Sequence, residues 1–365
     1  MKFYCAQEKL GQALQIVSRG IPNRSTLPIL SGIYLEYQEG ALLLRTTDLE
    51  IGMEITLSDI EGEQEGAVVV SGKRLADIVR FLPQEQVAFS FDQEQNQVFL
   101  RTRRSSFQLP VLPVQEFPAL PDIKSEISFK IAAGTLKEGI RKMIYATLPD
   151  DIRPYLTAVL FELTPGFIKL AATDINRLAL ETFPLEGIEK GGKFLVPTRA
   201  LQEINRIALN ENRKIEVDIA PRQIRFKTEN LVFISRLVEA QFPEYEKVLP
   251  KNFQTKVVIS RIDIIQALER VSLMVPSVKM NITRDKIVLA TNEPEIGKAV
   301  EEIESDRIEG TDLNIGFNSR FLLEFLNAVD SEEVLMKFTG EEKPAVMEAV
   351  GLENYMYVVM PMKII

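Results

Sequence analysis

The most constraining feature of this sequence is an internal repeat. When the chain is compared with itself at a shift of 126 positions, its first third aligns with its second third without a gap. The aligned pairs include Phe3 with Phe129, Leu10 with Leu136, Thr47-Asp48 with Thr173-Asp174, Leu75 with Leu201, and Phe107 with Phe233. A looser third copy follows, in which Ala290-Thr291 replaces Ala172-Thr173. One supersecondary plan is therefore used three times.

The length of the chain fits three domains of similar size. Its 365 residues exceed what one hydrophobic core usually serves, and proline-rich joints occur at Phe117–Pro121 and at Phe242–Pro250. Because proline fixes φ and interrupts strands, these joints read as linkers. We predict domains at residues 1–124, 125–252 and 253–365.

Each repeat is expected to contain two helices packed on antiparallel strands. Apolar residues at helical spacing mark the first helix of each copy at Leu10, Leu14 and Val17, at Leu136, Ile140 and Ile144, and at Ile264, Leu268 and Val271. The second helices carry Leu75, Ile78, Val79 and Leu82; Leu201, Ile204 and Ile207; and Leu322, Phe325, Leu326 and Val329. Alternating strands follow, separated by turns such as Glu39-Gly40 and Pro165-Gly166. The predicted fold class is α+β.

Composition narrows the function. The chain has no histidine, no G-x-x-x-x-G-K-[ST] loop and no G-x-G-x-x-G turn, so the commonest general base, zinc ligand and phosphate cradles are missing. An enzyme is disfavoured, and no cofactor is expected. The single cysteine, Cys5, fits a reducing compartment, and no run of about 18 apolar residues occurs. We expect a cytoplasmic protein outside the membrane.

The charge of the predicted helices differs from that of the whole chain. The chain totals −9, whereas the six helices hold twelve basic residues, Lys142 among them, against seven acidic ones. Lys73, Arg199 and Arg320 share one repeat position, and Arg80 matches Arg206. Residues seven apart share a helix face, here the one opposite the apolar stripe. Such a face can simply be solvated, but its recurrence favours a polyanion-binding surface.

Several motifs, in order along the whole chain, resemble one family. They are Thr26-Leu27-Pro28-Ile29-Leu30, Thr47-Asp48-Leu49-Glu50, Ala172-Thr173-Asp174, Arg177-Leu178-Ala179, Phe242-Pro243 with Tyr245, Val248-Leu249-Pro250-Lys251-Asn252, Ile315-Gly316-Phe317-Asn318 and Tyr357-Val358-Val359-Met360-Pro361-Met362. In these the chain is similar to the bacterial DNA polymerase III beta subunit family, the replicative sliding clamps.

The resemblance implies a processivity factor of the replicative polymerase. It implies three DNA-clamp domains that form half of a closed six-domain ring, a head-to-tail homodimer around duplex DNA bound without sequence preference. The implied partners are the catalytic subunit of the replicative polymerase, the clamp loader, and other polymerases and repair proteins that carry clamp-binding peptides.

The resemblance also implies site residues. The candidate DNA contacts are the helix residues Lys73, Arg74, Arg80, Lys137, Arg141, Arg199, Arg206 and Arg320, together with Arg24, Arg153 and Tyr155. The implied peptide pocket between the second and third domains comprises Leu156, Thr173, Ile175, Arg177, Leu178, Pro243, Val248, Val346, Val359, Met360, Pro361 and Met362. The implied dimer interface joins Phe107 and Leu109 to Leu273 and Met274 of a second copy. Core packing remains an alternative for the pocket residues and for Phe107.

The chain departs from the family pattern in two places. Ile175-Asn176 stands where the family usually has Gly-His, which would narrow the pocket floor and shift peptide preference. An aromatic pair expected to contact DNA is reduced to Pro154-Tyr155.

Two other functions compete with the clamp. A metal-dependent hydrolase could use Asp150, Asp151 and Asp174, although the recurrence of Asp174 as Asp48 suits a turn-forming side chain better. A repeat scaffold that binds proteins without encircling DNA is the second alternative.

Overall fold

The computed structural model describes residues 1–22, 24–188, 190–207, 211–293, 295, 297–305 and 307–363, with only the backbone described at Asn292 and Glu293. The chain forms two compact units. Unit 1 comprises Met1–Ala133 and Arg206–Leu237, and unit 2 comprises Gly134–Asn205 and Val238–Ile365. The units differ from the three predicted repeats because strands pair across the repeat boundaries. The boundaries at 124 and 252 remain predictions.

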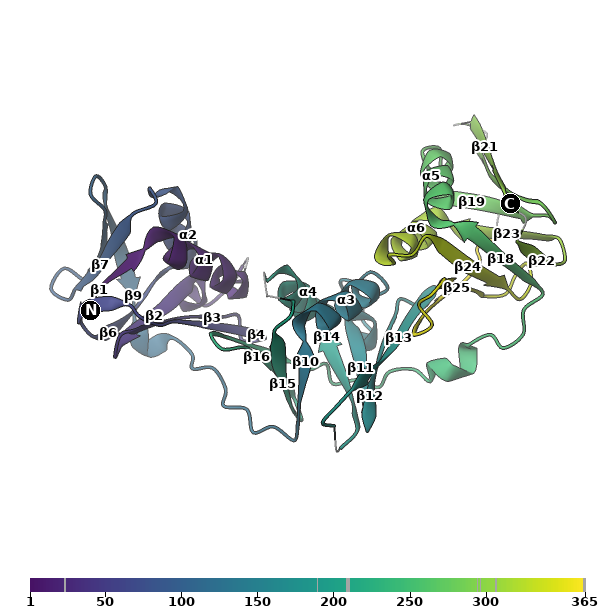
Figure 1. The fold of residues 1–365 in the computed structure, drawn as a ribbon. Helices are drawn as coiled ribbons and strands as arrows, with labels where there is room; N and C mark the ends of the chain where they lie inside the picture. Colours follow the sequence, from purple (N-terminus) through teal and green to yellow (C-terminus); the bar gives the residue numbers. More distant parts are fainter. Residues whose placement is uncertain are drawn as a thin grey trace. The chain divides into compact units, whose positions relative to one another are not determined.

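Unit 1 combines two helices with one antiparallel sheet. Helices α1 (Gln7–Val17) and α2 (Gly72–Phe81) lie side by side on it (Figure 1). The 13 strands run in the order β10-β15-β16-β17-β4-β3-β2-β6-β9-β8-β7-β1-β5. Their bounds are β1 Lys2–Ala6, β2 Gly32–Gln38, β3 Ala41–Thr47, β4 Ile51–Leu57, β5 Glu61–Gln64, β6 Gly66–Ser71, β7 Gln86–Asp92, β8 Gln97–Arg101, β9 Ser106–Leu112, β10 Ile127–Ala132, β15 Lys214–Ala220, β16 Gln223–Lys227 and β17 Leu231–Arg236.

Unit 2 combines four helices with two antiparallel sheets. The helices are α3 (Ala133–Ile144) and α4 (Thr198–Arg206), each with one end residue in unit 1, and α5 (Arg261–Ser272) and α6 (Ser319–Ala328). The sheets run β14-β11-β12-β13-β26-β25-β24-β18-β22 and β21-β20-β19-β23. The strand bounds are β11 Ala158–Thr164, β12 Gly166–Thr173, β13 Arg177–Leu185, β14 Gly192–Pro197, β18 Thr255–Ser260, β19 Ser277–Ile282, β20 Lys286–Glu293, β21 Gly297–Glu304, β22 Ile308–Gly310, β23 Leu313–Asn318, β24 Glu333–Phe338, β25 Ala345–Ala349 and β26 Tyr355–Val359.

The predicted helices and hairpins are confirmed with small shifts. The apolar stripes of α1 and α5 are buried, but in α3 Met143 is buried and Ile144 only half-buried. Leu82, Ile207 and Val329 are buried just beyond the ends of their helices. The α+β class holds, and no helix in the described residues is long and apolar enough to cross a bilayer.

Strand pairing joins successive repeats edge to edge. In unit 1, β17 of the second repeat pairs antiparallel with β4 of the first, with Phe233 opposite Met53. In unit 2, β26 of the third repeat pairs antiparallel with β13 of the second, with Tyr357 opposite Ala179. Since β4 and β13 occupy equivalent repeat positions, as do β17 and β26, the two seams are copies of one arrangement.

A buried polar cluster lies at the second seam. Lys142 of α3, one of the twelve basic helix residues, is buried, with its Nζ 2.7 Å from Glu181 Oε1 of β13 and 2.7 Å from Glu138 Oε1. The side chains of Lys142 and Glu181 are 2% and 5% exposed. The hydroxyl of Tyr355 donates to the carbonyl of Lys142, tying β26 to α3. The local helix pattern could not reveal this, because Glu181 lies on another element.

We expect the Lys142→Met variant to lose about 3–5 kcal/mol of unfolding free energy, because it leaves the Glu181 carboxylate buried without its cation. The double variant Lys142→Met/Glu181→Leu should recover most of that loss, since no buried charge remains. Urea unfolding followed by tyrosine fluorescence measures both. Equal losses in the single and double variants would contradict the pairing.

Candidate partner-binding groove and nucleic-acid interface

A cavity of about 260 Å³ lies in unit 2 over the β13–β26 seam. Seven residues predicted for the pocket line it: Thr173, Ile175, Arg177, Leu178, Pro243, Val248 and Met360. Five further residues complete the lining: Tyr155, Glu244, Tyr245, Pro344 and Val358. The walls come from the β12–β13 turn, the 3-10 helix η5 (Tyr245–Val248) and the segment after β26. We call this cavity the groove.

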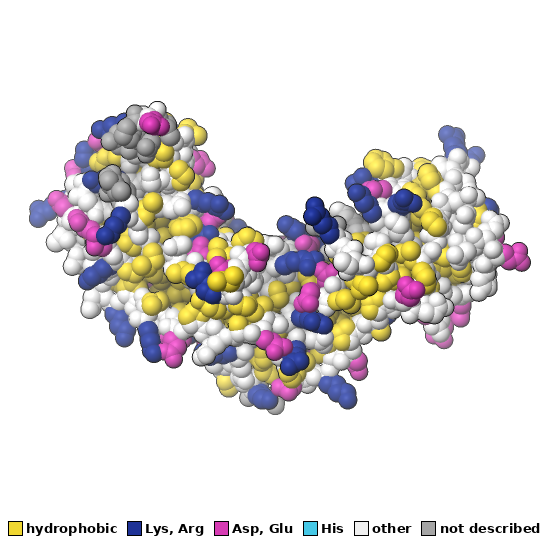
Figure 2. All heavy atoms as spheres, turned by 180° about the vertical axis from the view of Figure 1, so that it is seen from behind, with side chains coloured by type: hydrophobic (Ala, Val, Ile, Leu, Met, Phe, Trp, Pro, Cys, Tyr) yellow, Lys and Arg dark blue, Asp and Glu magenta, His cyan; other side chains and the backbone are white. Residues whose placement is uncertain are grey.

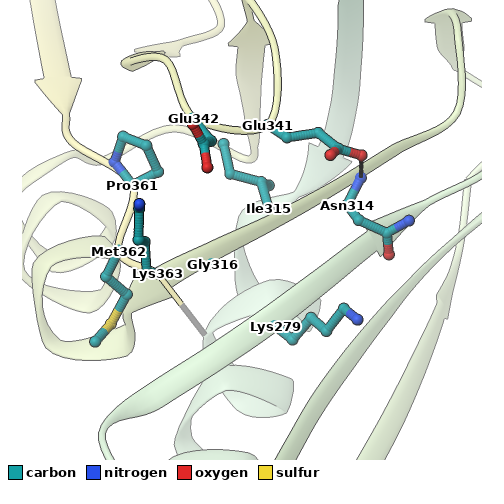
Figure 3. A pocket seen from close by; sticks show the side chains of 9 residues that line it. All are labelled: Lys279, Asn314, Ile315, Gly316, Glu341, Glu342, Pro361, Met362 and Lys363. Carbon is teal, nitrogen blue, oxygen red and sulfur yellow. Dashed lines mark hydrogen bonds between the residues drawn. The ribbon is translucent and has the colours of Figure 1, made fainter. Parts of the chain in front are cut away.

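Five other predicted residues are placed elsewhere. Leu156, Val346 and Val359 are fully buried in the core, so a ligand in the groove could not touch them without rearrangement. They lie outside the observed lining, and their part in peptide binding stays a prediction. Pro361 and Met362 line a second cavity of about 470 Å³, with Lys279 and Glu342 on its other sides (Figure 3).

Aromatic side chains form one end of the groove. Tyr155 packs edge-on against Phe242, with ring centroids 6.4 Å apart, and Phe242 packs in the same way against Tyr245 at 6.0 Å. The hydroxyl of Tyr245 donates to Glu162 at 3.0 Å. The sequence motif Phe242-Pro243 with Tyr245 could have indicated Tyr245. Tyr155 was assigned only to DNA; the structure places it in the groove wall, and its DNA contact stays a prediction.

The floor of the groove is a turn held by its own side chains. Asp174 Oδ1 accepts hydrogen bonds from the amides of Asn176 and Arg177, and Thr173 Oγ1 accepts one from the amide of Ile175. These bonds hold Ile175 at φ +81°, a left-handed conformation that costs a β-branched residue about 1–2 kcal/mol. Leu49 repeats this conformation in the first copy, at φ +76°.

The carboxylate oxygens of Asp174 are thus occupied by hydrogen bonds. Its Oδ2 also accepts from Arg177 Nε at 2.9 Å. Asp151 accepts from the guanidinium of Arg153. Within the described ranges, no three acidic or thiol side chains converge in a way that could hold a metal ion. This arrangement supports a structural role for Asp174.

Arg177 is the most constrained side chain of the groove wall. Besides Asp174, it donates to Glu324 of α6 and to the carbonyl of Tyr145. Its guanidinium lies over the Phe321 ring at 4.4 Å and the Tyr145 ring at 5.3 Å, and its side chain is only 5% exposed. Burial alone would lower the pKa of Arg177, but Tyr357 and Glu324 outweigh it and raise that pKa. Arg177 is therefore a fixed cation.

The first seam is covered by a linker side chain at the position that corresponds to Leu178 of the groove. At the position equivalent to Leu178, β4 carries Gly52, and the linker residue Leu120 lies directly over it, 2.4 Å from where a Cβ would stand. Leu120 of the first linker thus covers β4 at a position where the second seam borders the groove. The difference comes from the side chains, since the strand pairing is the same.

Most of the candidate DNA contacts are exposed. Arg24, Lys73, Arg74, Arg80, Arg153, Arg199, Arg206 and Arg320 are exposed, and Lys137 and Arg141 are half-buried. Several of these cations have carboxylate neighbours: Arg80 pairs with Asp77, Arg141 with Asp330, Arg153 with Asp151, and Arg320 with Glu324. Figure 2 shows basic side chains interspersed with acidic ones on the face that it draws. A phosphate that binds one of these four arginines would therefore replace the carboxylate that is paired with it.

The four candidate dimer residues differ in how far their side chains are exposed. Leu273 is 83% exposed and Phe107 38% exposed, which is unfavourable for large apolar side chains of a free chain. Met274 is half-buried. Leu109 is buried within unit 1, and its role as a dimer contact stays a prediction.

Comparison with known proteins decides the family. Three models of the DNA polymerase III beta subunit match: the N-terminal domain at residues 1–121, the central domain at 130–244 and the C-terminal domain at 246–363. The beta sliding clamps of Staphylococcus aureus and Staphylococcus epidermidis are 30% identical over 375 residues, covering 100% of this chain and 99% of theirs. The chain belongs to the DNA polymerase III beta subunit family.

Solved structures agree with this family and with the fold. The chain is similar to the DNA polymerase sliding clamp of Bacillus subtilis, at a TM-score of 0.96 and 27% identity. It is also similar to the DNA polymerase III beta subunit of Thermotoga maritima, at 0.93 and 30%. Both comparisons cover 100% of each chain. The predicted architecture of three clamp domains is thereby confirmed.

The ion pair between Arg153 and Asp151 should make the stability of the fold depend on pH. Arg153 donates side-chain and backbone hydrogen bonds to Asp151 and lowers the pKa of that carboxyl from 3.8 to about 2. A lowered pKa means that this pair supports the fold above about pH 3.8, and that the support is lost as the pH falls through about 2. Carbon NMR of Asp151 should give a midpoint near 2, rising toward 3.8 in Arg153→Ala. An unchanged midpoint in the variant would contradict the pairing.

Proposed function

We propose that this chain is the processivity factor of a replicative DNA polymerase, and that it acts as a head-to-tail homodimeric ring that encircles duplex DNA. The observation that carries the ring is the position of two strand edges. Strands β9 and β21 are the repeat equivalents of the strands that join the repeats within the chain. Each is therefore suited to the same pairing with a second copy.

The equivalence follows from the repeat. Phe107 of β9 corresponds to Phe233 of β17, and β21 follows Thr291 as β13 follows Thr173. In the described residues, β21 pairs only with β20, and β9 meets β6 only at Val111 and Leu112. The remaining edges can accept a partner strand. A contact between two different edges is heterologous, and closes into a ring when the rotation per step divides the circle.

The two edges are chemically complementary. The β8–β9 hairpin carries Arg101, Arg103 and Arg104, whereas β21 carries Glu301, Glu302 and Glu304. Each edge also presents one large apolar side chain, Phe107 at 38% exposure and Val300 at 47%. Opposite charge around an apolar centre fits an interface between copies, with Leu273 and Met274 as its neighbours on the β21 side.

A ring that encloses the duplex explains how a protein with a net negative charge can stay on DNA. We infer that the exposed cations of the helices, Lys73, Arg199 and Arg320 among them, meet the phosphates without reading the bases. Weak phosphate contacts permit sliding, and the closed ring prevents loss. The protein then needs no catalytic group and no cofactor, and we expect it in the cytoplasm.

The groove is proposed as the docking site for short extended peptides of partner proteins. Apolar and aromatic walls with a few fixed polar groups suit a ligand held by side-chain burial. The proposed partners are the polymerase catalytic subunit, the clamp loader, and other polymerases and repair proteins. The exposed side chains of Met360 and Val248 give the walls the adaptability that several partners require.

A topological test separates the ring from a scaffold that does not enclose DNA. The cognate clamp loader places the protein on a nicked circular plasmid, which is then cut once. We expect bound protein to be lost after the cut, because it slides off the ends. Retention after linearisation would contradict the ring. Phe107→Asp is the matched control: it should sediment as a monomer and fail to remain on the uncut circle.

The groove is tested by placing a charge in its wall. We expect Val248→Asp to weaken binding of a labelled peptide from the polymerase catalytic subunit by about tenfold or more, since a carboxylate would be desolvated against the ligand. Phe167→Asp, an exposed apolar residue of β12 outside the lining, should not change affinity. Fluorescence anisotropy measures both. Equal effects of the two changes would contradict the placement.

A further inference from the structure

One carboxylate connects the groove to the helix that carries Arg320. Glu324 of α6 accepts from Arg320 Nε at 2.9 Å through Oε1, and from Arg177 of the groove wall through Oε2. Arg177 in turn donates to Asp174 at 2.9 Å. All four side chains lie in unit 2 and form one continuous series of ion pairs.

The exposure of these side chains decides which of them an approaching anion can displace. Arg177 and Asp174 are each 5% exposed, and their contacts with the turn and the two rings leave them little freedom. The side chain of Arg320 is 75% exposed, and among the described residues it donates its hydrogen bond to Glu324 of the same helix. A competing anion would therefore move Arg320 and leave Arg177 in place.

We propose that Glu324 is a positioning residue that couples the groove to DNA: a phosphate that draws Arg320 away makes the groove more negative. This rests on the proposed function, in which Arg320 faces DNA. Together the four groups are neutral; without Arg320, the remaining Arg177, Asp174 and Glu324 carry −1. Asp174 and Glu324 lie behind the groove wall, whereas Glu244, which lines the groove, forms a separate ion pair with Lys247.

As a consequence, the peptide preference of the groove differs between the free and the DNA-loaded clamp. A free clamp tolerates an acidic residue beside the apolar anchor of a partner peptide, whereas a DNA-loaded clamp disfavours it and favours a basic one. Because Arg320 is exposed and its charge is partly screened, its removal changes the affinity about threefold for each charged peptide. Partners could thereby be exchanged on loading without movement of the backbone.

The test uses three versions of the labelled polymerase peptide, with Asp, Asn or Lys beside the apolar anchor. Arg320→Ala should weaken the Asp peptide and strengthen the Lys peptide, each about threefold, and leave the Asn peptide unchanged. Lys73→Ala, the repeat-equivalent change in unit 1, is the control and should shift none of them. Loading wild type on a nicked circle should reproduce the Arg320→Ala pattern, with no further shift when Arg320→Ala itself is loaded.

Opposite shifts for the Asp and Lys peptides distinguish a charge effect from a loosened structure, which would weaken all three peptides together. Equal shifts for all three, or shifts no larger than those of Lys73→Ala, would overturn the coupling while leaving the groove in place. Glu324→Gln should shift the Asp and Lys peptides in the opposite sense to Arg320→Ala, because Arg177, Asp174 and Arg320 then carry +1. Failure of every peptide to bind wild type would overturn both the groove and the coupling.

Discussion

Antiparallel pairing of a strand from one repeat with a strand from the next is the constraint on which the rest of this molecule depends. It places β4 beside β17 and β13 beside β26, so that neighbouring repeats share a sheet instead of meeting through a flexible linker. Backbone hydrogen bonds across such a seam alternate along the two strands, which gives the joint a fixed direction and register. The compact units of the structure consequently cut through the middle repeat.

The two seams show how one backbone arrangement acquires different uses. At the first, Gly52 and the linker residue Leu120 close the surface. At the second, Leu178 and the η5 segment leave a groove, and a buried cluster of Lys142, Glu181 and Tyr355 replaces simple apolar packing. Buried charges stabilise little by themselves, but removing one partner is costly. The second seam is therefore the more sensitive to substitution.

Much of this could be predicted from the sequence, because the repeat, the helical stripes and the turn residues are local patterns. The α+β class, the six helices and seven groove residues follow from them and from the family resemblance. The burial of individual side chains could not be predicted. Leu156, Val346 and Val359 were assigned to the pocket by the same resemblance as the lining residues, but they are buried. The burial of Lys142 could not be predicted because its partner Glu181 lies on another element, and the link of Glu324 to Arg177 forms only on folding.

The exposed edge of β21 also affects how a newly synthesised chain avoids aggregation. Before it meets a second copy, each subunit carries strand edges that could join any extended segment, and such edges promote aggregation. Lys298, Glu302 and Glu304 alternate along β21, and Pro110 removes one amide donor from β9. Charges and proline of this kind discourage indiscriminate pairing while leaving a complementary partner acceptable. Solubility during synthesis and selective assembly thus draw on the same few side chains.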